Sequence, residues 1–182
     1  IEGPTLAQII EKTGKRLDAE HVAWITERIL NVLMYMHERA IIHGDIKPQN
    51  VIIQPKSHTV VVVDFGLAMI RPKSNSASPG YTKKFAPPEQ IQELPLLPAS
   101  DFFSLGKTML WALCGGDEND FNAHSVPAST PKPLCDFINS LIVRDILQRP
   151  QDTLQLHEEF MNVREQAFGR RRSGMKPIPG LD

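Results

Sequence analysis

The chain has 182 residues, a formal net charge of −1, 41% hydrophobic residues and two cysteines. This length can bury one sizeable core, and the balanced charge gives no reason to expect nucleic acid or an anionic membrane as a partner. No apolar run reaches the roughly 18 residues of a membrane segment. The cysteines are too few for a zinc site or a disulfide framework. We therefore expect a cytoplasmic chain, whose parent protein could be membrane-anchored.

Two helices are predicted at the start of the chain. Thr5 and Gln8 form a capping box for a short first helix, which ends at Gly14. Asp18 can cap a longer second helix, expected to reach about Arg39 because apolar residues recur at helical spacing. The second helix leads into a polar loop.

A β-hairpin is predicted after that loop. The β-branched runs 51–53 and 60–63 predict two short strands, and residues 55–58 between them predict a turn. Such a hairpin brings the chain back to its starting point. We therefore expect Asn50 and Asp64, at its two ends, to lie close together.

The rest of the chain is predicted to consist of helices and irregular connections. Residues 71–80 are expected to form a loop, and residues 117–133 are expected to be irregular. Helices are predicted at about 100–114, 134–142 and 152–168. The first of these is apolar nearly all round and is therefore expected in the core.

The domain is expected to span residues 1–168. Residues 169–182 begin with a run of arginines and also contain Gly and Pro. They are predicted to form a basic, flexible tail or linker with solvated charges, in preference to a nucleic-acid-binding patch.

Two short runs carry the candidate chemistry: His43-Gly44-Asp45-Ile46-Lys47-Pro48-Gln49-Asn50 and Asp64-Phe65-Gly66. They place a carboxylate, an amine and an amide on one loop and a second carboxylate beyond the hairpin. This set suits phosphoryl transfer, which depends on positioning and charge neutralisation more than on covalent chemistry. Carboxylate and amide oxygens are also the hard ligands that Mg²⁺ prefers.

At these runs the chain resembles the large C-terminal lobe of eukaryotic-type serine/threonine protein kinases, over about residues 1–168. Five motifs occur in the family's order: the catalytic loop 43–50, Asp64-Phe65-Gly66, Pro87-Pro88-Glu89, Asp101 with Gly106, and Arg149. The resemblance implies a protein kinase-like large lobe. That lobe is mainly α-helical, with a small β-hairpin carrying the catalytic and metal-binding loops (α+β), and the small N-terminal lobe is absent from this chain.

The resemblance implies transfer of the γ-phosphate of ATP to Ser or Thr hydroxyls of a protein substrate. Asp45 would act as the base, Lys47 would neutralise charge on the phosphoryl group, and Thr82 would help to position the substrate. Lys47, Asn50 and Asp64 would bind the nucleotide. Asn50 and Asp64 would hold Mg²⁺, with Mn²⁺ as an alternative ion.

Six further residues have structural roles implied by the resemblance: His43, Phe65, Gly66, Glu89, Asp101 and Arg149. His43 is expected to brace the loop, although a histidine so close to Asp45 also suggests an acid/base pair. Asp101 is expected to accept hydrogen bonds from backbone N–H groups of the catalytic loop. Glu89 and Arg149 are expected to form a buried ion pair.

Gly44 departs from the family pattern. Many kinases have an arginine here that binds a phosphate on the activation segment, so this chain resembles a non-RD kinase. We therefore expect that phosphorylation at the segment's hydroxyl residues (Ser74, Ser76, Ser78 and Thr82) is not needed as a switch.

The chain also lacks the glycine-rich loop and the Val-Ala-Ile-Lys strand with which the family holds ATP. Because it opens on Ile1, without a Met, it is interpreted as a fragment of a longer protein. The missing small lobe of the kinase is an expected partner. We expect this fragment alone to bind ATP weakly and to be inactive.

Two alternative functions remain. A small-molecule phosphotransferase of the aminoglycoside or choline kinase type also favours His-Gly-Asp, which Gly44 matches, but Lys47 and Pro87-Pro88-Glu89 argue against it. A pseudokinase that serves as an interaction module is the second alternative. The presence of all the catalytic-loop and metal residues argues against it.

Overall fold

The computed structural model describes residues 2–13, 16–54, 57–73, 75–174 and 177–178. Its α-helices are α1 (Leu6–Thr13), α2 (Ala19–His37), α3 (Pro88–Ile91), α4 (Pro98–Leu113), α5 (Glu118–Asn122), α6 (Lys132–Leu141) and α7 (Thr153–Phe168). Its strands are β1 (Ile41–Ile42), β2 (Val51–Gln54), β3 (Thr59–Val62) and β4 (Met69–Ile70), and 3₁₀ turns form η1 (Pro48–Asn50) and η3 (Ile146–Gln148). The mainly helical α+β class is confirmed.

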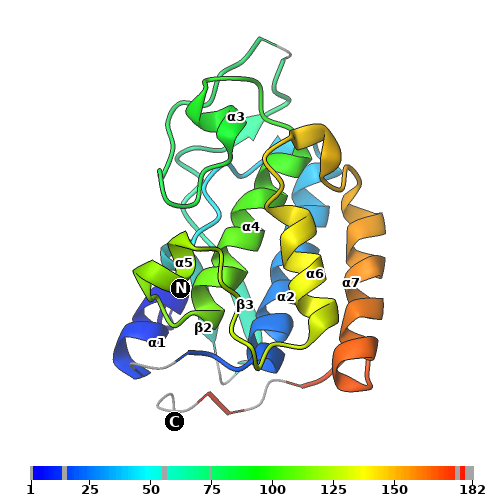
Figure 1. Cartoon of the computed structure of the whole chain (residues 1–182). Coiled ribbons are helices and arrows are strands. Elements are labelled where there is room, and N and C mark those ends of the chain that lie inside the picture. The colour runs from blue at the N-terminus through cyan, green and yellow to red at the C-terminus, as the bar shows by residue number, and fades with distance from the viewer. Residues whose placement is uncertain (1, 14–15, 55–56, 74, 175–176, 179–182) are drawn as a thin grey trace.

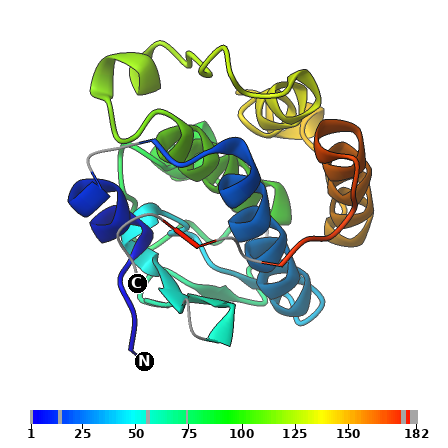
Figure 2. The same ribbon diagram turned by 90° about the horizontal axis from the view of Figure 1, so that it is seen from below.

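Helices α2 and α4 run side by side through the middle of the molecule (Figure 1). Helix α6 packs on α4, α7 packs on α2, and α6 and α7 contact each other, which closes a four-helix group. Seen from below, α6 and α7 lie on one side of the central pair, and α1 lies on the other side near the hairpin (Figure 2).

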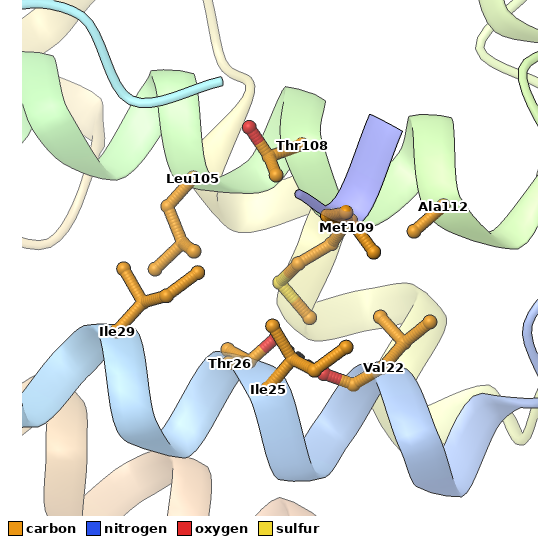
Figure 3. Close-up of a pocket in the computed structure, with 9 residues that line it drawn as sticks. Val22, Ile25, Thr26, Ile29, Leu105, Thr108, Met109 and Ala112 are labelled. Carbon is orange, nitrogen blue, oxygen red and sulfur yellow. Dashed lines mark hydrogen bonds between the residues drawn. The ribbon is translucent and has the colours of Figure 1, made fainter. Parts of the chain in front are cut away.

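The α2–α4 contact forms the centre of the core. The side chain of Asp18 accepts hydrogen bonds from the backbone N–H groups of Glu20 and His21, which caps α2 as expected. Side chains of the two helices interdigitate and leave a cavity of only about 10 Å³ between them (Figure 3). A space of that size holds no more than a single water, so this contact is packing and not a binding site.

Gly106 allows α4 to lie close against α6. A Cβ atom at this position would come within 2.9 Å of Leu141 Cβ and 2.8 Å of Ile142 Cγ2. Close packing of α4 in turn fixes the position of Asp101, which lies in its first turn.

The predicted hairpin is present. Strands β2 and β3 are antiparallel, with Val51 opposite Val62 and Gln54 opposite Thr59. The predicted turn is only partly described, because residues 55–56 lie outside the described ranges. A second antiparallel pair, β1 with β4, was not predicted, since each strand has only two residues.

One prediction of local structure needs correction. The stretch 117–133 was expected to be irregular, but it contains α5, which Asp117 caps by accepting hydrogen bonds from Asn119 N and Asp120 N. Phe121 of this helix is buried against Phe85, at 5.7 Å between ring centroids. The cap and the buried aromatic residue overrode the weak helical pattern of the sequence.

The predicted tail makes contacts with the domain. Arg170 forms an ion pair with Glu20 of α2, and Arg171 Nη2 lies 2.9 Å from Glu158 Oε2 of α7. Ile178 is only 2% exposed and belongs to the core. These contacts concern single residues of the stretch 169–182, whose role as a flexible tail or linker stays a prediction. Within the described ranges, no helix is both long enough and apolar enough to span a bilayer.

Candidate active site

The predicted catalytic loop connects β1 to β2. Ile46, at its centre, is completely buried and anchors the loop in the core. Pro48 begins the 3₁₀ turn η1, which turns the chain into β2 and places Asn50 at its end. Asp45 and Asn50 are themselves only 7% and 5% exposed.

Three of the predicted site residues contact the Asp45 carboxylate. Lys47 Nζ lies 2.6 Å from Asp45 Oδ2, and Thr82 Oγ1 donates to Asp45 Oδ1 at 2.7 Å. Lys47 Nζ also donates to Thr82 Oγ1 at 3.0 Å. Asn50 Nδ2 donates to the carbonyl oxygen of Asp45 at 2.9 Å and to its Oδ2 at 3.0 Å. The structure thus joins the loop to Thr82, which lies 37 residues further along the chain.

Asp64 lies beyond the end of β3 and is exposed. It adopts a left-handed backbone with φ of +64°, and its Oδ1 accepts a hydrogen bond from Gly66 N at 3.2 Å. The residue before it, Val63, donates its N–H to the carbonyl oxygen of Asn50 at 2.9 Å. The hairpin therefore brings the backbone at Asp64 next to that at Asn50.

The side-chain oxygens of Asn50 and Asp64 suit a magnesium ion as ligands. The side-chain hydrogen bonds of Asn50 in the described part of the chain are donated by Nδ2, which leaves Oδ1 available as a ligand. Asp64 offers the carboxylate oxygen that Gly66 does not bind. Mg²⁺ takes few protein oxygens and completes its shell with water and phosphate oxygens. A sulfur- or histidine-rich transition-metal site is not seen, since no cluster of three or more His, Cys, Asp or Glu suits a metal among the described residues.

Asp101 is fully buried beneath the loop and supports it. Its Oδ2 accepts the N–H of His43 and its Oδ1 accepts the N–H of Gly44, both at 2.9 Å. His37 Nε2 lies 2.8 Å from Asp101 Oδ2, and His37 Nδ1 lies 2.7 Å from Thr153 Oγ1. The end of α2 and the start of α4 therefore meet at this carboxylate, and His37 links it to Thr153 at the start of α7.

His43 makes contacts with the backbone and with an aromatic ring. Its Nδ1 accepts the backbone N–H of Asp45 at 3.2 Å, and its ring lies 5.1 Å from that of Phe65 between centroids. An Nδ1 that accepts a hydrogen bond carries no proton of its own. No contact between His43 and the carboxylate of Asp45 is found among the described residues, which fits a bracing role better than an acid/base pair.

Glu89 and Arg149 form a bidentate ion pair, with distances of 2.8 Å and 2.9 Å between the guanidinium and carboxylate atoms. Both residues are buried. Ser100 Oγ also donates to Glu89 Oε1 at 2.8 Å, and Arg149 donates to three backbone carbonyls. This network fastens α3, and with it the end of the segment that contains Thr82, to α4.

Gln90 is a site residue that the sequence analysis missed. Its Nε2 donates to Gly44 O at 2.8 Å, Gly80 O at 2.9 Å and Ser78 Oγ at 3.0 Å, and the residue is only 2% exposed. It joins the catalytic loop to the segment before Thr82. No sequence pattern around Pro-Pro-Glu predicts these contacts of the following glutamine, because its partners are identified only in the folded chain.

Gly44 has a steric reason to be a glycine. It has a φ of +73°, and a Cβ atom here would lie 2.8 Å from the carbonyl oxygen of Leu67. A larger side chain in this conformation would strain the loop.

Of the hydroxyl residues predicted as dispensable phosphorylation sites, Ser74 lies outside the described ranges.

Comparisons with known proteins agree with this geometry. Residues 1–161 match the family described as protein kinase domain. Serine/threonine-protein kinase F of Synechocystis sp. is 32% identical over 176 residues, which cover 90% of this chain and 34% of that relative. Serine/threonine-protein kinase PknA of Nostoc sp. is 35% identical over 127 residues, covering 63% of this chain and 22% of that relative. Mitogen-activated protein kinase kinase 1 of Arabidopsis thaliana is 26% identical in a gapped alignment of 189 residues that covers 91% of this chain and 53% of that relative. This chain thus spans a third of the first relative's length and at most about half of the others.

Proposed function

This chain belongs to the protein kinase family, as a large C-terminal lobe of the eukaryotic serine/threonine type, and we propose that it transfers the γ-phosphate of ATP to Ser or Thr hydroxyls of proteins. The observation that carries this proposal is the buried carboxylate of Asp45 in contact with both Lys47 and Thr82. Such a group can align an alcohol, while a cation beside it neutralises charge on the phosphoryl group.

Asp45 is the proposed base. Its carboxylate accepts the hydrogen bond of the incoming hydroxyl and aligns the hydroxyl oxygen with the γ-phosphorus. As the new O–P bond forms and the bond to the bridging oxygen of ADP breaks, the hydroxyl proton passes to Asp45. Thr82 and Lys47 hold the carboxylate in place through the 2.7 Å and 2.6 Å contacts. Asn50 and Asp64 would hold Mg²⁺, which neutralises phosphate charge when bound.

A protein substrate is favoured over a small molecule by the anchored segment that contains Thr82. Glu89 and Arg149 fasten its end, and Ser104 Oγ donates to the carbonyl oxygen of Phe85 at 3.0 Å. These contacts give an extended peptide a fixed surface beside Asp45. An aminoglycoside or choline would not need such a surface.

The adenine end of the nucleotide is proposed to bind elsewhere. The residues that this chain offers, Lys47, Asn50 and Asp64, address the phosphates and the metal. We therefore propose that a small lobe completes the nucleotide site, and that this chain alone binds ATP weakly and is inactive.

The proposal is tested by phosphate transfer from ATP to a generic Ser/Thr protein, using the full-length protein. Asp45→Ala and Asp64→Ala are each expected to reduce kcat by at least about 100-fold, while Lys132→Gln, on the exposed side of α6, should match the wild type. Equal transfer by all four proteins would overturn the assignment. Nucleotide binding without transfer by the wild type would favour an interaction module, and transfer only to small alcohols would favour the small-molecule alternative.

We also propose that the activation segment needs no phosphate. The buried Gln90 links it to the loop at Gly44, where an arginine would otherwise receive that phosphate. Ser76→Ala in the full-length protein should leave kcat within about twofold of the wild type, and Ser76→Glu should not raise it. A loss restored by the acidic replacement would contradict this proposal.

A further inference from the structure

A groove lies next to the candidate active site. It has a volume of about 210 Å³ and is formed by the segment after Thr82, by α3, by α4 and by the chain after α6. Its lining residues are Lys83, Lys84, Ala86, Pro88, Ile91, Gln92, Phe103, Lys107 and Arg144. Its walls are therefore partly apolar, and all of its ionised groups are cations.

The positive charge of the groove is largely uncompensated. Lys84 forms an ion pair with Glu118 of α5. For Lys83, Lys107 and Arg144, no carboxylate lies within 4 Å in the described part of the chain, and no Asp or Glu lines the groove. Lys83 and Arg144 are exposed, so their charges are available to a ligand.

Lys107 is the unusual member of this set because it is buried, with only 6% of its surface exposed. Its Nζ lies 3.9 Å from the centroid of the Phe121 ring and 3.2 Å from His124 Nε2. Burial lowers the pKa of Lys107 to about 8, and repulsion from Lys84 contributes. The side chain therefore remains mostly charged near neutral pH, and an anion in the groove would stabilise it.

The groove lies where side chains of a bound peptide substrate can reach it. Lys83 and Lys84 directly follow Thr82, whose hydroxyl donates to Asp45. A peptide that presents a hydroxyl to Asp45 runs along this segment, and an extended chain advances only about 3.3 Å per residue. Side chains within a few residues of the phosphate acceptor can therefore reach the groove.

We propose that this groove binds acidic side chains of the protein substrate, so that the enzyme prefers Ser or Thr residues flanked by Asp or Glu. The inference rests on the proposed function, because it places the groove beside the phosphate acceptor. It adds a substrate class that neither the family nor the comparisons specify.

The test uses the full-length protein and three peptides that share one serine and carry Glu, Gln or Lys at the flanking positions. Peptide binding is measured by fluorescence anisotropy without ATP, and phosphate transfer is measured separately as kcat/KM. We expect the Glu peptide to bind and react about three- to tenfold better than the Gln peptide, with a smaller ratio at high salt.

Two double variants test whether the preference for the Glu peptide arises from the groove. Lys83→Gln combined with Arg144→Gln changes only exposed side chains and should reduce the Glu-to-Gln ratio to about one. Lys83→Glu combined with Arg144→Glu should reverse the preference toward the Lys peptide. Lys132→Gln removes an exposed lysine outside the groove, with 83% of its side chain exposed, and should keep the wild-type ratio.

The outcomes separate this inference from the proposed function. Transfer to all three peptides with equal kcat/KM would overturn the groove assignment and leave the kinase assignment standing. Preferential binding of the Glu peptide without any transfer would support the groove and overturn the kinase activity. A preference that persists in both double variants would show that the acidic residues bind elsewhere.

Discussion

The two acidic residues of the proposed site, Asp45 and Asp64, differ in burial and in side-chain contacts. Asp45 is 7% exposed, and its side chain contacts Lys47, Thr82 and Asn50. Asp64 is exposed, and within the described residues its side chain accepts one hydrogen bond, from Gly66 N. The group that would orient the hydroxyl is thus positioned by the protein before any substrate arrives. The group that would hold a metal is left accessible, which suits a ligand that must enter and leave with its nucleotide.

The largest effect is expected when the segment that positions Thr82 beside Asp45 loses its anchor. Glu89→Gln leaves the buried Arg149 without its counter-charge, which is expected to reduce the free energy of unfolding by about 3–5 kcal/mol. Urea denaturation followed by circular dichroism measures this loss. Adding Arg149→Met to Glu89→Gln should recover part of it, and a single variant as stable as the wild type would mean that the pair is not a structural anchor.

A smaller effect is expected at Gln90. Gln90→Met keeps the side-chain length but removes the donor shared by Gly44 O, Gly80 O and Ser78 Oγ, and it should cost about 1–3 kcal/mol of stability. The same substitution at the exposed Gln92 is the matched control and should cost less than about 0.5 kcal/mol. Equal losses in the two variants would show that the Gln90 contacts add nothing.

Asp64→Ala should affect activity and stability to very different extents. Because Asp64 is exposed and the structure assigns it one local hydrogen bond, its removal should change the free energy of unfolding by only about 0.5 kcal/mol while abolishing phosphate transfer. Isothermal titration of Mg²⁺ in the presence of ATP gives a second readout, since the metal should bind more weakly to the full-length variant. A large loss of stability would place Asp64 with the supporting residues instead.

The last prediction concerns the pH dependence of stability at Lys107. Its pKa is about 8 in the folded protein against an ordinary value of 10.5, so the unfolded chain binds more protons between these values. The contribution of Lys107 to stability therefore rises as the pH increases from 8 to 10.5. Wild type minus Lys107→Met should show this rise in denaturation experiments, whereas wild type minus Lys132→Met should show no such slope.

The groups that face Lys107 do not reverse this sign. Burial lowers the pKa of His124, which is therefore neutral across the whole range. Burial also raises the pKa of the Cys114 thiol to about 11, so the thiol stays mostly protonated. Lys84 is a like charge and adds to the cost of charging Lys107. A flat difference between pH 8 and pH 10.5 would contradict the buried environment of Lys107.

The sequence predicted the fold class, the main helices and the hairpin because each of these has a strong local signal. Asp18 marked the start of α2, and the β-branched runs marked β2 and β3 to within one residue. The short helix α5 and the two-residue strands β1 and β4 were missed, since elements of that length are stabilised mainly by contacts with distant residues. The contacts of the tail were missed for the same reason.

For the candidate site, the sequence alone determined the chemical groups, because the residue types that carry a carboxylate, an amine and an amide, and the spacing between them, are given directly by the sequence. It interpreted Gly44 as a missing arginine, whereas the carbonyl of Leu67 and a φ of +73° give the glycine a steric reason. It gave no indication of Gln90 or of the cationic groove. Both arise where residues far apart in the chain are brought together, and only the packing of α3 and α4 against the loop decides which of them meet.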